Sequence, residues 1–134
     1  MWELTLWQPW ASLIAHGHKQ VETRAWGTKH RGPLAIHAAK RPMGPDERWL
    51  LDELEHEFGI VLPDVPLGAV VATANLAACD VMTQTALEAV DEVEYRVGDW
   101  GIGRYAWRLS GVKRLEEPVP AVGRQLLWRW QVPA

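Results

Sequence analysis

Residues 69–81, AVVATANLAACDV, constrain the fold of this chain more than any other segment, because nearly every position is apolar. The side chains of a strand alternate between its two faces, so a strand of this composition needs cover on both. We therefore expect residues 69–81 to form a long central strand, with neighbouring strands at its edges and other elements packed over it.

Five shorter segments also show the alternation or the composition of strands. They are residues 2–7, 19–26, 34–39, 104–115 and 126–132. Residues 8–17 and 44–59 instead have apolar side chains at helical spacing, and Gly17 and Gly59 are suited to end these helices in the left-handed conformation. A further short acidic helix is predicted to begin at the capping box TALE, Thr85–Glu88.

The strands outnumber the helices and are joined by short turns and helical insertions, which favours an α+β fold over a doubly wound sheet. We predict a small mixed β-barrel with short helices capping one side. With 134 residues, the chain is expected to form a single domain, residues 1–134. The glycines of GDWGIG, residues 98–103, lack the preceding strand and the following helix of a dinucleotide-binding loop.

Several classes of protein are disfavoured by what the sequence lacks. Cys79 is the single cysteine and the five histidines have no metal-binding spacing, so we expect no internal disulfide, no metal and no cofactor. No apolar run approaches the roughly 20 residues that cross a bilayer, and the first ten residues do not resemble a secretion signal. We therefore expect a cytoplasmic protein without membrane contacts.

The net charge of −3 is distributed unevenly along the chain. Residues 19–41 carry a net +5, residues 42–101 a net −11 and residues 102–134 a net +4. If the two basic blocks meet in space, they would form a local positive surface that attracts phosphates. The alternative is that these charges are solvated side chains on strand edges and loops.

Nine tryptophans form the second unusual feature of the composition. A tryptophan has a large apolar face that favours burial, and packing explains those that alternate along strands or lie on a helix, namely Trp49, Trp107, Trp128 and Trp130. Four others fall at the ends of elements or in loops, where aromatic faces can stack on bases: Trp7, Trp10, Trp26 and Trp100. For these four, packing and ligand stacking are equally good interpretations.

The predicted strand at residues 19–26 places several charged groups beside an aromatic ring. Its period of two puts Val21, Thr23 and Ala25 on an inward face, and the opposite face carries Glu22, Arg24 and Trp26. On the strand at residues 34–39, His37 likewise lies opposite the apolar positions. It either points into a cleft or is a hydrogen-bonded histidine beneath a helix.

The segment GHKQVETR, Gly17–Arg24, matches the GxKxxExR signature of ASCH domains at all four defining positions. LWQPWASLI before it, RGPLAIHAAK after it and GRYAWRL followed by LWRW near the C-terminus resemble small prokaryotic ASCH proteins in the same order. The resemblance therefore extends over nearly the whole chain.

This resemblance implies a PUA-like β-barrel, with a cleft between the barrel and its helices, and a role in binding RNA. It also implies that Lys19, Glu22 and Arg24 lie at the cleft. Arg24 and Lys19 can hold a phosphate, Glu22 can orient the arginine or accept a hydrogen bond from a base, and Trp26 can stack on that base. The alternative is a structural ladder of ion pairs on an exposed strand, each worth about 0–1 kcal/mol.

The predicted ligand is thus a short single-stranded RNA segment or a nucleotide in a basic cleft. The residues expected to contact it are Lys19, Glu22, Arg24, Trp26, Trp10, Arg31, His37 and Lys40.

The resemblance also raises the alternative of a small hydrolase. Some small members of the family hydrolyse N4-acylated cytidines with a lysine and a threonine of the signature and a distant glutamate, and others are described as ribonucleases. This chain keeps Lys19 but has Glu22 in place of that threonine, and Thr23 is expected to face the other way. The central strand has Asn75 where many relatives carry an acid. A Lys19 and Glu22 pair acting on a water molecule is the remaining catalytic interpretation.

Overall fold

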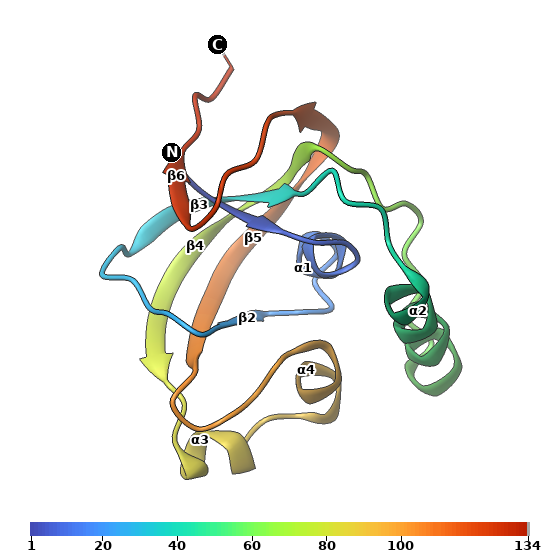
Figure 1. Ribbon diagram of the computed structural model, residues 1–134, viewed down its shortest axis with the longest axis vertical. Coiled ribbons are helices and arrows are strands. Elements are labelled where there is room, and N and C mark those ends of the chain that lie inside the picture. Colours follow the sequence, from blue (N-terminus) through green and yellow to red (C-terminus); the bar gives the residue numbers. More distant parts are fainter. Residues whose placement is uncertain (134) are drawn as a thin grey trace.

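One mixed six-stranded sheet curls into half a barrel, and the helices lie against its inner side and one end (Figure 1). The computed structural model describes residues 1–133. The strand order is β2-β5-β4-β3-β1-β6, and among the strands of residues 1–133 only the β1–β3 pair is parallel. The strands are β1 (Trp2–Leu6), β2 (Val21–Arg24), β3 (Gly32–Ala38), β4 (Ala69–Val81), β5 (Tyr105–Pro120) and β6 (Leu127–Arg129).

Helix α1 lies within the curve of the sheet, where it contacts β1, β3, β4 and β5. The helices are α1 (Trp10–Ala15), α2 (Pro45–Phe58), α3 (Gln84–Glu88) and α4 (Glu92–Val97). The predicted left-handed glycines are present: Gly17 has φ 80° just after α1, and Gly59 ends α2 with φ 67°. No helix between residues 1 and 133 has the length and apolar composition needed to span a membrane.

Strand β4 has the predicted bounds and the predicted central place, between β3 and β5. Other elements cover its outer face over a shorter length than its apolar composition predicts. The first part is buried on both faces, with Val71 in the core inside the curve and Val70 in a smaller core on the outer face. Asn75 and Asp80 are exposed, because the second part extends beyond the elements that cover the outer face.

Two apolar clusters hold the sheet in this shape. The inner cluster joins α1 to the sheet and has Trp107 and Leu76 fully buried within it. The outer cluster packs Trp130 against Ala35 and Val70, so the chain after β5 covers part of the outer face. Full burial of a large aliphatic or aromatic side chain contributes about 1.5–3 kcal/mol, so these clusters provide most of the driving force for folding.

Several local predictions were wrong in position. Helix α3 is capped by Thr83, whose side chain accepts a hydrogen bond from the Ala86 amide, and it ends at Glu88, where the capping box placed its first turn. Strand β5 continues beyond the predicted end at residue 115 to Pro120, because its far end pairs with the start of β4. Trp49 is 63% exposed, since α2 lies at the margin of the fold and packs chiefly through Leu54.

Strands β1 and β2 approach each other at the opening of the half-barrel but do not pair. The Arg24 side chain bridges this gap, because its Nη2 donates a hydrogen bond of 2.8 Å to the Thr5 carbonyl. Strand β6 pairs with β1 only from Trp2 to Leu4. From Thr5 onwards, the edge of β1 is therefore not paired with β6.

Candidate functional site

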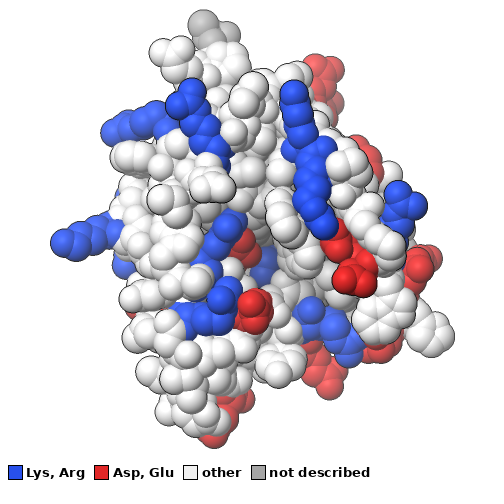
Figure 2. Space-filling model, viewed as in Figure 1, with Lys and Arg blue, Asp and Glu red and all other residues white. Residues whose placement is uncertain are grey.

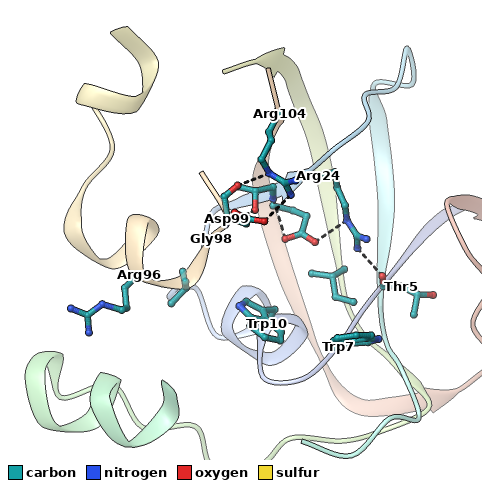
Figure 3. Close-up of a pocket in the computed structure, with 12 residues that line it drawn as sticks. Thr5, Trp7, Trp10, Arg24, Arg96, Gly98, Asp99 and Arg104 are labelled. Atoms are coloured by element: carbon teal, nitrogen blue, oxygen red, sulfur yellow. Dashed lines mark hydrogen bonds and ion pairs between the residues drawn. The ribbon is translucent and has the colours of Figure 1, made fainter. Parts of the chain in front are cut away.

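A cavity of about 410 Å³ lies where strands β1 and β2 meet helix α4 (Figure 3). One wall is formed by residues 5–7 and Trp10, the floor by residues 22–24 and the opposite wall by residues 96–99 and Arg104. Figure 2 shows a hollow near the middle of this face of the molecule, with both basic and acidic side chains around it.

Glu22 is the centre of the charged group that the signature supplies. Its Oε2 lies 3.0 Å from Arg24 Nε, although off the line of that N–H bond, and its Oε1 lies 3.8 Å from Lys19 Nζ. Oε1 also accepts a hydrogen bond of 3.1 Å from the Thr23 amide. The ammonium, the carboxylate and the guanidinium therefore lie together, as the sequence pattern indicates. Glu22 and Arg24 line the cavity, whereas Lys19 lies behind them.

Lys19 is only 1% exposed, in contrast with the position at the mouth of the cleft expected from the sequence. Its Nζ donates a hydrogen bond of 3.0 Å to the carbonyl of Val97, the last residue of α4. Burial lowers the pKa of Lys19, while the nearby Glu22 and Glu94 carboxylates oppose this shift. The ammonium thus fastens α4 to the beginning of β2 rather than lining the cavity.

Helix α4 and the loop after it form a wall that the sequence reading missed. The Glu94 carboxylate accepts hydrogen bonds from the amides of Gln20 (2.6 Å) and Val21 (3.3 Å), which lie at the edge of the sheet. Burial raises the pKa of Glu94, and these hydrogen bonds oppose the shift. Thr23 Oγ1 accepts a hydrogen bond of 2.9 Å from the Asp99 amide, so this threonine, expected to face away, lines the cavity too.

The guanidinium groups of the cavity are each paired with a carboxylate. Arg104 lies 3.4 Å from Asp99, and Arg96 lies 3.0 Å from Glu57 on α2. Together with the pairing of Arg24, these contacts make the cavity mixed in charge rather than strongly basic. The reason is that α4 and Asp99 belong to the acidic block, residues 42–101, which the fold brings against the basic segment.

The tryptophans predicted to stack on bases separate into two groups. Trp10 lines the cavity, and so does Trp7, which is 53% exposed and has the Arg41 guanidinium 3.9 Å from its ring centroid. Trp26 lies outside the cavity and packs edge-to-face on Trp107, with 4.9 Å between the ring centroids. Trp100 also lies outside, and its indole donates a hydrogen bond to the Glu94 carbonyl.

The other three predicted contact residues do not line this cavity. Arg31 is exposed and donates to the carbonyls of Thr28 and His30. His37 is buried beneath the chain that follows β5, rather than beneath a helix, with its Nε2 2.7 Å from the Ala121 carbonyl oxygen. Lys40 lies near His37, beside a second hollow on the other side of Thr5.

Some lining residues lacked any signal in the sequence. Thr5 and Leu6 looked like ordinary strand positions, and Arg104 was read as the start of a strand. Asp99 belongs to the GDWGIG segment, whose pattern indicates no binding motif. Within residues 1–133, no group of three or more histidine, cysteine, aspartate or glutamate side chains is arranged to hold a metal ion.

Known proteins resemble this chain in sequence and in fold. Activating signal cointegrator 1 from Homo sapiens and that from Mus musculus are each 36% identical to this chain over an alignment of 85 residues, which covers 58% of the chain. The match spans only 14% of the length of those proteins.

Among solved structures, the crystal structure of ASCH from Zymomonas mobilis superposes with a TM-score of 0.60 and 17% sequence identity. The alignment covers 97% of this chain and 87% of that one, and a mutant of the same protein gives the same TM-score. At this identity the likeness concerns the fold, which matches the expected PUA-like architecture.

The family model of the ASCH domain matches residues 4–120, which include β2 to β5 in full and β1 from Leu4 onwards. The chain therefore belongs to the ASCH domain family.

Proposed function

We propose that this chain binds a short single-stranded RNA segment or a nucleotide in the cavity between β1, β2 and α4. The observation that supports this most strongly is the pairing of an aromatic wall, Trp7 and Trp10, with a polar floor, Glu22 and Arg24. A cavity of about 410 Å³ lies within the size range of small-molecule sites, and its concave shape suits one nucleoside.

Each part of the cavity has a chemical role in this proposal. An exposed tryptophan face stacks on any base and contributes about 1–3 kcal/mol. The Glu22 carboxylate accepts a hydrogen bond from an exocyclic amino group, which cytosine and adenine carry and uracil lacks. The Arg24 guanidinium, held by Glu22 and the Thr5 carbonyl, is a fixed donor for the sugar or the phosphate.

The test is titration with cytidine, uridine and a short single-stranded RNA at low salt, for the natural protein and for Trp7→Ala. We expect Trp7→Ala to weaken binding about tenfold, the equivalent of about 1.4 kcal/mol of lost stacking. Trp49→Ala is the matched control, because Trp49 is similarly exposed but lies on α2 outside the cavity. Glu22→Gln should remove the preference for cytidine over uridine.

Absence of binding even at low salt would contradict the proposal. So would binding that is indifferent to both Trp7→Ala and Arg24→Ala.

The second candidate is a hydrolase, and the contact of 3.8 Å between Lys19 and Glu22 favours it. In this case Glu22, which lines the cavity, acts as a general base on a water molecule. Lys19 lies behind it and supplies a nearby positive charge. The test is turnover of N4-acetylcytidine and of RNA. Turnover that is lost in Glu22→Gln supports the hydrolase, whereas no turnover by the natural protein supports the binding module.

A further inference from the structure

A second hollow of about 300 Å³ lies on the other side of Thr5 from the first cavity. Thr5 lines both, so the two hollows adjoin at this residue. They meet over the part of β1 beyond Leu4, which β6 does not pair with. Figure 3 shows Thr5 at the border of the first cavity, beside Trp7 and within reach of Arg24.

The outer wall of the second hollow is the segment at residues 121–125, and His37 holds it in place. His37 Nε2 donates to the Ala121 carbonyl at 2.7 Å, and Nδ1 therefore accepts from the Thr5 hydroxyl at 3.1 Å. Burial lowers the pKa of His37, which is consistent with this neutral form. Gly123 lies so close that a Cβ atom there would be 2.6 Å from the ring of His37. His37 thus positions the wall rather than contacting a ligand as a charged group.

The charge of the second hollow differs from that of the first. Lys40 and Arg124 line it, together with Gln125, and no carboxylate lies among its lining residues. Lys40 belongs to the basic block at residues 19–41 and Arg124 to the basic block at residues 102–134. The two blocks therefore meet here with no carboxylate in the lining, whereas at the first cavity, which Arg24 and Arg104 both line, each arginine has an acidic partner.

We propose that the second hollow is a phosphate subsite, which receives the backbone of the nucleotide adjoining the base held in the first cavity. This inference rests on the proposed function and makes it more specific. The ligand is then a strand of two or more linked nucleotides, bound more tightly than a free nucleoside. The lysine and the arginine supply mobile and planar donors to phosphate oxygens, and Gln125 can donate to the sugar.

The experiment compares cytidine with the trinucleotide CpCpC, for the natural protein and for the double variant Lys40→Met, Arg124→Gln. Methionine keeps the aliphatic stem with which Lys40 lies over Gly68. We expect the double variant to bind CpCpC about tenfold more weakly at low salt and to bind cytidine unchanged. The slope of log affinity against log salt concentration is negative, and it should become less steep by about 0.7 for each phosphate contact removed.

The matched control is Arg48→Gln, Lys113→Met, which removes the same charge from exposed positions outside both hollows. Equal losses in the two double variants would overturn the subsite, because the effect would then be one of overall charge. Natural protein that binds cytidine and CpCpC equally well would also overturn it, while leaving the proposed function intact. Failure of the natural protein to bind either ligand would overturn both.

Discussion

The surroundings of Glu3 in this fold change the ionisation of its side chain. Its side chain is fully buried on the outer face of β1, where it lies opposite Trp128 of β6, and neither carboxyl oxygen has a hydrogen-bond partner within residues 1–133. Burial raises the pKa of Glu3 to about 8, and the N-terminal ammonium opposes this shift. The folded protein therefore holds this carboxyl group in its protonated form at neutral pH.

This raised pKa predicts a pH-dependent stability. The pKa of the folded state lies above the value of 4.5 for the unfolded chain, so the folded state binds the proton more tightly. The free energy of unfolding should fall by about 1.4 kcal/mol per pH unit between about pH 4.5 and 8, and level off above. Glu3→Gln should remove this component, which urea unfolding at pH 5 and pH 8 would measure.

Glu116→Gln is the control, because Glu116 is exposed on β5. A Glu3→Gln variant whose stability changes with pH as steeply as that of the natural protein would contradict the assignment.

At the scale of elements, α4 depends on tertiary contacts more than on its own sequence. It is six residues long, and isolated helices of this length are unstable in water. The side chain of Asp91 caps its first turn, Glu94 ties it to the β2 edge, and Lys19 holds its last carbonyl. These hydrogen bonds therefore hold one wall of the cavity in position.

Lys19→Met tests this attachment. It removes the hydrogen bond to Val97, takes the buried positive charge away from Glu94 and leaves Glu22 with Arg24 alone, a change expected to cost about 3–5 kcal/mol. We expect faster amide hydrogen exchange across residues 92–99. Adding Glu94→Gln should restore part of the stability, because it removes the uncompensated charge. Unchanged exchange in α4 would show that Lys19 does not hold this helix.

At the scale of the whole molecule, the charge distribution bears on the RNA binding that we propose. The chain has a net charge of −3, and acidic and basic side chains stand together around the central hollow (Figure 2). Lys40 and Arg124 line the second hollow, and no carboxylate is among the other residues that line it. This distribution of charge therefore gives little support for a broad electrostatic contact with a nucleic-acid duplex.

The salt dependence of binding follows from this distribution. With Arg24, Lys40 and Arg124 as the phosphate-binding groups, the slope of log affinity against log salt concentration should be about −2 for single-stranded RNA. Fluorescence anisotropy between about 50 and 200 mM salt would measure it, with duplex DNA as the comparison. A slope several times steeper, or equal binding of the duplex, would mean that a much wider surface takes part.

The sequence pattern was sufficient to predict the parts of the fold that depend on residues close together in the chain. The apolar run of β4 predicted its bounds and its central place, and the glycines after α1 and α2 adopt the expected backbone conformations. The GxKxxExR segment predicted that Lys19, Glu22 and Arg24 would lie together, because they are close in sequence and their spacing is set by one short strand.

The tertiary structure decided which of these groups reach the cavity and which partners they meet. Curling of the sheet brings Arg24 to Thr5 and turns Lys19 towards α4, and it leaves Trp26 packed on Trp107. Lys40 and Arg124 are far apart in the sequence and meet only through the path of the chain after β5. Such long-range proximity depends on how the sheet curls and on what covers its edges, so alternation and spacing cannot determine it.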